Sequence, residues 1–331
     1  MALLWVTFLL PRWFENISSS ALGGAIEFVT MDWLGILFLV FICLLLIDII
    51  TIFGLILKYY VSRLRTAALL GGVLLSITAI AQGMRPPVIN DYDIQLTNLP
   101  TEDDGLVLAV ISDTHVGSLI SETWLEARIA QINEIKPDMV LLLGDLFEGD
   151  NQNERSEKMA SIFRNIEAPL GVWGVTGNHD FHSNIDSSLN FCHKAGINLL
   201  RNDWKEIRPG LVLGGVDDGH EHGRNESSSD RLRQLLSAKP LGAASILMSH
   251  RPQGVEEAAA AGVGLMLSGH THGGQIWPFS YISGYVNRLL AGEYIIDGMP
   301  IIVTRGAGTW GPRMRLWAPG EILRITLHSQ N

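Results

Sequence analysis

Cysteine and basic residues are scarce in this sequence. Among its 331 residues there are two cysteines, Cys43 and Cys192. Cys43 lies in a long apolar run and Cys192 in the more polar remainder of the chain, so the two are poorly placed for a disulfide and indicate no redox compartment. Lysine and arginine number 24 against 34 aspartates and glutamates, and the first 85 residues hold five of the basic and four of the acidic ones. Residues 86–331 therefore carry a net charge of about −11, which argues against a nucleic acid as the preferred partner.

Internal repeats and low-complexity tracts are also absent, and one large domain is the expected organisation of residues 99–331. Residues 86–98, which begin with Pro86 and Pro87, are predicted to be the linker that precedes this domain. The polar stretch 217–230 is predicted to be a surface loop, in which His220 and His222 are solvated rather than bound to a metal.

The first 85 residues lack charge over two long stretches and are predicted to form a membrane anchor. Residues 33–57 contain a single charged side chain, Asp48, and are long enough to cross a bilayer with some tilt. Residues 66–84 are predicted to form a second, shorter transmembrane helix. A buried core helix is the alternative for each stretch. Whether residues 1–32 contain a further membrane segment stays open, because the apolar part of that region is too short to span a bilayer alone.

Basic residues flank the two apolar stretches unequally. Lys58, Arg63 and Arg65 crowd the segment between them, and the positive-inside rule places that segment in the cytoplasm. The expected location is therefore a bacterial inner (plasma) membrane, crossed more than once, with the large domain outside the cytoplasm. Residues 63–82 also resemble an internal signal sequence with a candidate cleavage site after Ala81. Cleavage and retention as an anchor both stay open, and the preceding span favours retention.

Five short apolar runs are typical of buried β-strands, because they are rich in leucine and β-branched residues. They are residues 106–112, 138–144, 171–177, 244–249 and 264–269. Apolar residues at helical spacing separate several of these runs. One predicted helical face contains Trp124, Leu125, Ile129 and Ile132, and another contains Met159, Ile162, Phe163 and Ile166. The alternation predicts an α/β fold, in which ligands gather at the carboxyl ends of the strands.

Side chains suited to metal binding or acid–base chemistry follow each of the five runs. They are Asp113, His115, Asp145, Asn178, His179, His250, His270 and His272. A lone Asp-x-His or Gly-Asp is usually a turn, but five chance turns would not all supply such groups at strand ends. Carboxylate and amide oxygens mixed with imidazoles suit a pair of divalent ions such as manganese, iron or zinc. Two such ions can hold a phosphoryl group and ionise the water that attacks it.

In chain order the clusters spell D-x-H, G-D, G-N-H-D, H and G-H-x-H. This pattern resembles that of the calcineurin-like metallophosphoesterase superfamily. The segments GHTHGGQIWPF (269–279) and VTRGAGTWGPRMRLWAPGEILRITL (303–327) are similar to its bacterial membrane-associated branch. The resemblance covers roughly residues 100–328. It implies a two-sheet α/β sandwich, preceded here by N-terminal transmembrane helices, and the hydrolysis of a phosphoester.

The resemblance also implies a role for each clustered residue. The first metal ion would be bound by Asp113, His115 and His272, the second by Asn178, His250 and His270, and both by the bridging Asp145. The ions would be manganese, iron or zinc, with manganese favoured. His179 would protonate the leaving oxygen while a metal-bridging hydroxide attacks phosphorus, and a histidine suits this task because its ordinary pKa is about 6.5.

One residue departs from the family's pattern. Many relatives read G-D-x-x-D, where the second aspartate orients the catalytic histidine, whereas this chain has Glu148 in that place. The longer side chain would still reach His179, so Glu148 is the second candidate catalytic residue. Asp180 is expected to cap a turn rather than to act in catalysis. Arg305 would either contact a substrate phosphate or be exposed or ion-paired.

Membrane attachment favours a lipid-linked phosphomonoester, phosphodiester or pyrophosphate as the substrate, with the lipid bilayer as the other partner. Relatives in the family include the UDP-2,3-diacylglucosamine pyrophosphatases of lipid A synthesis. Such an enzyme needs a cytoplasmic active site, which the charge distribution opposes, so it stays as the alternative function. A non-catalytic binding module on the same fold is a further alternative, although every ligand position and His179 are present in this sequence.

Overall fold

The structure is a computed structural model of the chain, and it describes residues 21–117, 120–147, 154–182, 185–218 and 228–330. The chain divides into two compact units. The first consists of Met1–Arg85, Gln275–Trp277 and Thr309–Pro319, and the second of Pro86–Gly274, Pro278–Gly308 and Gly320–Asn331. Two short segments from late in the sequence therefore belong with the N-terminal helices.

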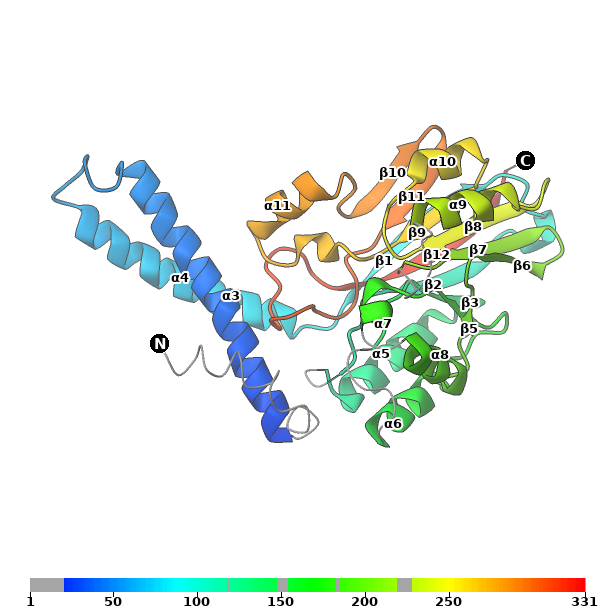
Figure 1. Cartoon of the computed structure of the whole chain (residues 1–331), viewed down its shortest axis with the longest axis horizontal. Helices are drawn as coiled ribbons and strands as arrows, with labels where there is room; N and C mark the ends of the chain where they lie inside the picture. Colours follow the sequence, from blue (N-terminus) through cyan, green and yellow to red (C-terminus); the bar gives the residue numbers. More distant parts are fainter. Residues whose placement is uncertain (1–20, 118–119, 148–153, 183–184, 219–227, 331) are drawn as a thin grey trace. The chain divides into compact units, whose positions relative to one another are not determined.

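Two long apolar helices make up most of the first unit. α3 spans Ala21–Ile50 and α4 spans Val61–Gly83 (Figure 1, blue and light blue). By length and composition, Phe28–Ile50 and Val61–Gly83 are each able to cross a membrane. Large apolar side chains such as Phe41 and Leu74 are exposed on them. A helix that is apolar on all sides suits a lipid environment better than the surface of a soluble protein.

The first apolar helix ends earlier than the predicted segment 33–57. α3 ends at Ile50, and residues 51–57 form turns in which Ile52, Phe53 and Leu57 have positive φ. Thr51 Oγ1 donates a hydrogen bond to Ile47 O (2.8 Å) just where the helix stops. Hydropathy did not reveal this boundary, because the turn is built from side chains as apolar as those of the helix.

Small residues let the two helices pack closely. A Cβ atom added to Gly72 of α4 would lie 2.7 Å from Cα of Val40 in α3, so only glycine permits this approach. Leu39, next to Val40, and Ala79, farther along α4, form an apolar cluster with Ile276, Met314 and Leu316. The two late segments are thus held to the helices by apolar packing.

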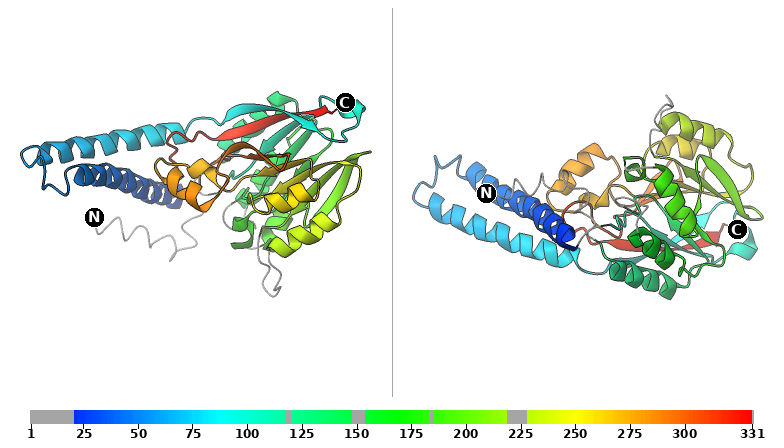
Figure 2. Two further views of the ribbon diagram at one scale, coloured as in Figure 1. Left: turned by 90° about the horizontal axis from the view of Figure 1, so that it is seen from above. Right: turned by 60° about the horizontal axis from the view of Figure 1, so that its bottom comes forward.

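The second unit contains two six-stranded sheets (Figures 1 and 2). The first sheet has the order β1 (Val88–Leu96), β12 (Glu321–Ser329), β2 (Val107–Ile111), β3 (Met139–Leu142), β4 (Val172–Gly174) and β5 (Asn198–Leu199). The second has the order β10 (Gly292–Ile296), β11 (Met299–Val303), β9 (Leu265–Ser268), β8 (Ala244–Ser249), β7 (Leu211–Val216) and β6 (Asp203–Arg208). Strands β2 to β5 run parallel to one another, as do β7, β8, β9 and β11.

Helices connect the strands of both sheets. They are α5 (Glu122–Ile135), α6 (Glu154–Phe163), α7 (Asn178–His182), α8 (Ile185–Lys194), α9 (Ser228–Ser237), α10 (Val255–Ala260) and α11 (Phe279–Val286), with the short 3₁₀ turns η1 (Thr101–Asp103) and η2 (His272–Gly274). At the start of α5, Ser121 Oγ accepts a hydrogen bond from Trp124 N (3.2 Å), which satisfies a backbone donor that the helix leaves without a partner.

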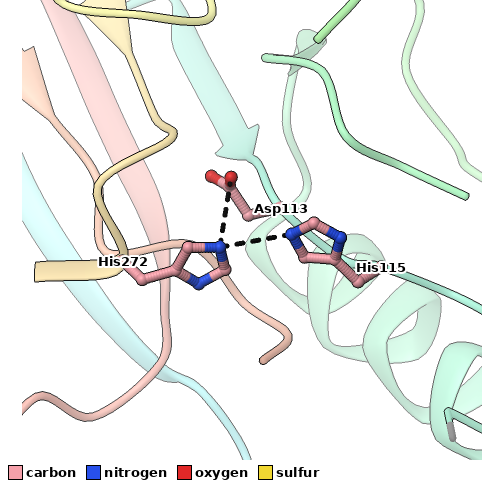
Figure 3. Close-up of side chains that lie close together, drawn as sticks. All are labelled: Asp113, His115 and His272. Atoms are coloured by element: carbon pink, nitrogen blue, oxygen red, sulfur yellow. Dashed lines mark hydrogen bonds and ion pairs between the residues drawn. The ribbon is translucent and has the colours of Figure 1, made fainter. Parts of the chain in front are cut away.

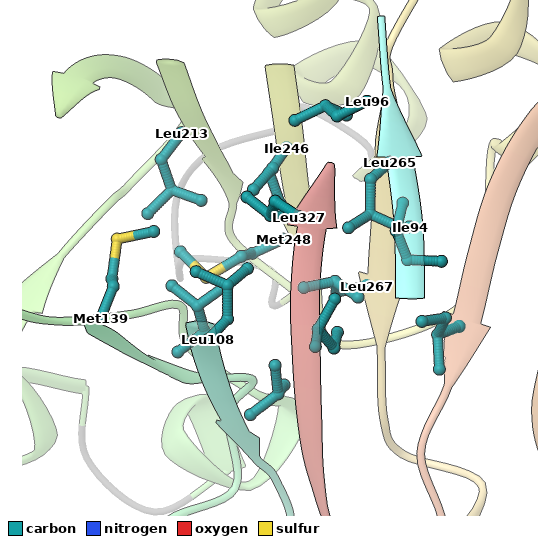
Figure 4. Packing of buried hydrophobic residues seen from close by; sticks show 14 of the residues in the cluster. Ile94, Leu96, Leu108, Met139, Leu213, Ile246, Met248, Leu265, Leu267 and Leu327 are labelled. Atoms are coloured by element: carbon teal, nitrogen blue, oxygen red, sulfur yellow. The ribbon is translucent and has the colours of Figure 1, made fainter. Parts of the chain in front are cut away.

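Alternate residues of the strands face two different apolar clusters. Leu108 and Val110 of β2 join a cluster that both sheets share, whereas Ala109 and Ile111 pack with residues of α5, α6 and α8. Figure 4 shows the shared cluster, in which Leu108 and Met139 of the first sheet lie near side chains of the second. A third cluster packs α9 and α10 on the second sheet. The layers are therefore helix, sheet, sheet and helix, which confirms the predicted two-sheet α/β sandwich and the apolar helices before it.

All five predicted strands are present as β2, β3, β4, β8 and β9, and both predicted helical faces lie on helices, α5 and α6, with Ile166 just beyond the end of α6. The segment 86–98, predicted as a linker, differs: residues 88–96 form β1, which pairs in parallel with β12. Its polar residues alternate with partly buried ones at the sheet edge, so the segment lacks the continuous apolar run that marks a central strand.

Candidate metal centre

The predicted site residues lie at the carboxyl ends of strands from both sheets. From the first sheet come Asp113 and His115 after β2, Asp145 after β3, and Asn178 and His179 at the start of α7, after β4. From the second sheet come His250 after β8, and His270 and His272 after β9. Parallel strands of one sheet end at the same edge, so residues far apart in the sequence meet there.

Asp113, His115 and His272 form the first group, shown in Figure 3. Nε2 of His115 lies 3.2 Å from Nε2 of His272, and that same His272 atom lies 3.5 Å from Asp113 Oδ1. All three residues are buried. Two imidazole nitrogens and a carboxylate oxygen thus point at one small volume, which is the arrangement that a bound cation requires.

Asp145, His250 and His270 form the second group. His250 Nε2 lies 3.1 Å from Asp145 Oδ2 and 3.2 Å from Asn178 Oδ1. Its other ring nitrogen, Nδ1, lies 2.7 Å from the carbonyl oxygen of Leu143, which favours a hydrogen on Nδ1 and leaves Nε2 directed at the centre.

Asp145 and Asp113 also contact residues of the neighbouring clusters. Asp145 Oδ1 accepts a hydrogen bond from the backbone N–H of His179 (2.9 Å), and Asp113 Oδ2 accepts one from that of His270 (3.0 Å). The ring centroid of His179 lies 5.1 Å from that of His115, nearly perpendicular to it. His179 is therefore beside the two groups and less buried than most of their members.

The backbone around the groups is unusually tight. Asp113, His115, Asp145, His270 and His272 all have positive φ, which non-glycine residues seldom adopt and which is concentrated at functional sites. A Cβ atom on Gly177 would lie 2.1 Å from Asp145 Oδ1, so only glycine lets that carboxylate take its place.

Burial and mutual charge set the protonation of the second group. Burial opposes the negative charge of Asp145 and by itself would raise its pKa. The charge and hydrogen bond of His250 outweigh this effect, with smaller contributions from the charges of His115 and His179. Together they hold the pKa of Asp145 well below its usual range. Burial likewise opposes the positive charge of His250, yet Asp145 and Asp113 raise its pKa to about 10. Burial and the charge of His250 lower the pKa of His270 to about 3.

The protonation states of these residues show how strongly the centre favours a positive charge, and hence how well it suits divalent cations. The buried carboxylates of Asp113 and Asp145 favour a positive charge among them strongly enough to protonate His250. A pair of divalent cations meets the same electrostatic demand, and neutral imidazoles with carboxylate and amide oxygens are the donors that manganese, iron and zinc accept. The donor set of this structure therefore fits a two-metal centre.

The sequence also predicted roles for three residues beside the proposed ligands. Asp180 Oδ2 accepts a hydrogen bond from Gly177 N (2.7 Å), which confirms the expected turn cap, and burial together with the charge of Asp145 raises its pKa to about 6. Arg305 forms an ion pair with Glu321, which is one of the alternatives predicted for it. Glu148 lies outside the described residues, as do His220 and His222.

Two buried carboxylates next to the centre were not predicted from the sequence. Asp217 accepts hydrogen bonds from Thr176 Oγ1 (2.8 Å) and Arg201 Nε (2.9 Å), and Asp218 pairs with Arg251 (3.0 Å). Both aspartates are buried, so the start of the predicted surface loop 217–230 is not on the surface, and its last residues, 228–230, open α9. The signal was present, because both aspartates directly follow the apolar run 211–216, which forms β7.

A cavity of about 80 Å³ opens beside these residues, with Asp217, Asp218, Ser249 and Arg251 in its lining. Ser249 and Arg251 flank His250 in the chain. The residues on either side of this candidate ligand thus line the cavity.

Comparison with known sequences places this arrangement among phosphoesterases. The sequence model described as "Calcineurin-like phosphoesterase" matches residues 106–274, which include all eight clustered residues. A protein of Aquifex aeolicus named "Uncharacterized metallophosphoesterase" is 31% identical over 249 residues, covering 72% of this chain and 91% of that protein.

Two further relatives are longer than the part they share with this chain. A Danio rerio protein named "Transmembrane protein with metallophosphoesterase domain" is 29% identical over 280 residues, which cover 80% of this chain and 63% of that protein. An "Uncharacterized metallophosphoesterase" of Helicobacter pylori strain J99 is 32% identical over 255 residues, which cover 76% of this chain and 66% of that protein. This chain therefore spans slightly less than two thirds of either relative.

Among solved structures, a dimetal phosphatase from Danio rerio aligns with 68% of this chain and 99% of its own. The TM-score is 0.40 and the sequence identity is 15%.

Proposed function

This chain belongs to the calcineurin-like phosphoesterase family, and from that membership we propose that it is a membrane-anchored, two-metal phosphoester hydrolase. The observation that carries the proposal is the convergence of Asp113, His115 and His272 in one group and of Asp145, His250 and His270 in a second. Asn178 adds a neutral oxygen 3.2 Å from His250 Nε2. The composition of this cluster and its place at strand ends support a metal-binding role rather than a purely structural one.

We assign the ligands as follows. The first ion would be held by Asp113, His115 and His272, the second by Asn178, His250 and His270, and both by Asp145. The position of Asp145 supports a bridging role, since one carboxylate oxygen contacts His250 and the other accepts the backbone N–H of His179. When bound, two divalent ions polarise the phosphoryl oxygens and lower the pKa of the attacking water. Manganese is the ion that we favour.

His179 is the proposed general acid. Its backbone is fixed by Asp145, its ring lies 5.1 Å from that of His115, and its side chain is partly exposed, so it borders the centre without joining either group. In this position the imidazole would give a proton to the leaving oxygen of the substrate. Glu148 is the residue that we propose to orient it.

Two apolar helices long enough to cross a membrane, together with the transmembrane name of the Danio rerio relative, associate the chain with a membrane. We propose that α3 and α4 anchor the enzyme in a bacterial inner membrane and that the substrate is a lipid-linked phosphomonoester, phosphodiester or pyrophosphate. Tethering supports this substrate class, because it keeps the site within reach of molecules that cannot leave the bilayer.

The test is activity of the purified, manganese-loaded full chain against mono-, di- and pyrophosphate esters, with Asp145→Asn as the matched variant. We expect about two ions per wild-type chain, hydrolysis that chelation abolishes, and loss of most activity in the variant, because the two-metal geometry is lost. Turnover at the wild-type rate in chelator or in Asp145→Asn would contradict the two-metal mechanism.

A further inference from the structure

Helix α11 exposes its large apolar side chains instead of burying them. Tyr281, Ile282, Tyr285 and Val286 are between 55% and 92% exposed, and Phe279 is also exposed. At about 3.6 residues per turn these five residues form one continuous face of the helix. Soluble helices show the opposite pattern, with the apolar face towards the protein.

The opposite face of α11 consists of small residues that pack on the protein. Ser283 is buried, and a Cβ atom on Gly274 would lie 2.3 Å from Cα of Ser280. Asn287 N donates to Ser283 O (2.7 Å) at the end of the helix. The face of α11 that carries small residues thus packs on the turn His272–Gly274, which contains a proposed metal ligand. This packing leaves the apolar face of the helix directed outwards.

The segment that leads into α11 lies at one end of the α3–α4 pair, within the first unit. Trp277 N donates to Leu316 O (3.3 Å), and the rings of Trp277 and Trp317 lie 5.1 Å apart. Trp317 N donates to Gln82 Oε1 (2.9 Å) in the last turn of α4. Trp317 and Trp310 are more than half exposed. Tryptophans gathered at the end of an apolar helix pair are typical of the membrane–water interface.

We propose that α11 lies in the membrane interface, with Phe279, Tyr281, Ile282, Tyr285 and Val286 in contact with lipid. The chain passes from Trp277 to Phe279 through Pro278 alone, so α11 is covalently held to the segment that carries the interfacial tryptophan. An apolar face rich in aromatic residues suits the boundary between headgroups and acyl chains. The inference rests on the membrane anchor of the proposed function, to which it adds a second contact made by the catalytic unit.

The chemistry of the contact is apolar rather than ionic. Arg288, just after the helix, pairs with Glu256, and residues 86–331 carry a net negative charge. Attraction to anionic headgroups therefore contributes little, and neutral phosphatidylcholine is a suitable bilayer for the test. Because α11 packs on His272–Gly274, the contact would place the proposed metal centre beside lipid headgroups.

The experiment places one fluorescent label at a time on the full chain in phosphatidylcholine vesicles, with Cys43 and Cys192 replaced by alanine. Tyr285→Cys reports on α11, and Phe41→Cys reports on the proposed span. Leu241→Cys is the matched aqueous control, since Leu241 is 94% exposed and Tyr285 92%. Quenching by brominated phosphatidylcholine is measured for each label.

We expect the labels at positions 285 and 41 to be quenched at least about twofold more than the label at 241, with no dependence on salt, because apolar insertion is not screened. Quenching at 41 but not at 285 overturns the inference and leaves the membrane anchor intact. Absence of quenching at both positions overturns both. Energy transfer between labelled copies at 285, without lipid quenching, would mean that a second copy covers α11 and would also overturn the inference.

Discussion

At the scale of single residues, the charge balance of the centre depends on His250. This buried imidazole lies 3.1 Å from Asp145, and the charges of Asp145 and Asp113 raise its pKa to about 10. Its neighbour His270 has a pKa lowered to about 3, so the two histidines of the second group are in different protonation states at neutral pH. Only one of them must lose a proton before it can bind a metal ion.

Metal binding should therefore release a proton from His250. Below about pH 10 the metal-free protein holds His250 as a cation, and a bound ion requires the neutral form, so apparent metal affinity should increase as the pH is raised towards that value. His270, with its pKa of about 3, has no proton to release at neutral pH. Titration calorimetry of manganese in buffers with different ionisation heats measures the release. No proton release between about pH 7 and 9 would contradict a protonated His250.

His179→Ala should separate binding from chemistry. The variant should keep both metal ions, yet turnover of esters with poor leaving groups should fall roughly 10²–10⁴-fold, the usual loss for a general acid. Aryl esters, whose leaving oxygen hardly needs a proton, should be much less affected. Equal losses of turnover on both substrate types, or loss of metal from the variant, would show that His179 is not the general acid.

At the scale of elements, the site depends on how closely neighbouring strand ends approach. The loop after β4 passes so near Asp145 that Gly177 has no space for a side chain, and the backbone of Asp113 and Asp145 takes positive φ. This geometry is held by the parallel pairing of β2, β3 and β4 beneath it. The sheet thus supplies the rigidity with which strained residues are kept in place.

Gly177→Ala should weaken metal binding although no ligand is changed. The new methyl group would lie 2.1 Å from Asp145 Oδ1, and overpacking of this kind typically costs about 1–3 kcal/mol. The matched control is Gly71→Ala in α4, where a Cβ atom would have nothing within 4 Å. Metal affinity measured by calorimetry should fall only in the first variant. Equal affinity in both variants would show that the strand ends adjust without harm to the centre.

At the scale of the whole molecule, the proposed orientation in a membrane would decide which substrates reach the site. Lys58 lies between the two apolar helices, and Arg63 and Arg65 lie near the start of α4. Arg65 is paired with Asp48 near the end of α3 (2.7 Å). A short basic connection of this kind favours the cytoplasmic side. The catalytic unit would then lie outside the cytoplasm, where phospholipid headgroups are available and UDP-linked sugars are not.

A tag placed after Asn331 tests this orientation. Protease added outside spheroplasts should remove the tag, because the connection between α3 and α4 is expected in the cytoplasm. Detergent-lysed spheroplasts provide the control for the accessibility of the tag. Protection until lysis would reverse the orientation, and the UDP-2,3-diacylglucosamine pyrophosphatase function would then become the better proposal.

Sequence alone was sufficient for the central strands and for the residues that gather at their ends. Buried strands such as β2 and β8 are short apolar runs. The carboxyl ends of parallel strands lie at one edge of the sheet, so the residues that follow such runs lie at that edge even when they are far apart in the sequence. Edge strand β1 could not be recognised in the same way, because it has many polar residues and forms a strand by pairing with β12, which is far away in the sequence. Asp217 and Asp218 were missed because the run that forms β7 was not considered as a strand.

The sequence by itself determined the two apolar helices, the α/β class and the metal-type residues of the five clusters, since each follows from local patterns of apolar and polar side chains. Only the tertiary structure decided where α3 ends, that Trp277 and Trp317 belong with α3 and α4, and that α11 presents its apolar face outwards. These features depend on contacts between segments far apart in the chain. A local pattern shows that a residue is apolar, but the neighbour that it meets is fixed only when the chain has folded.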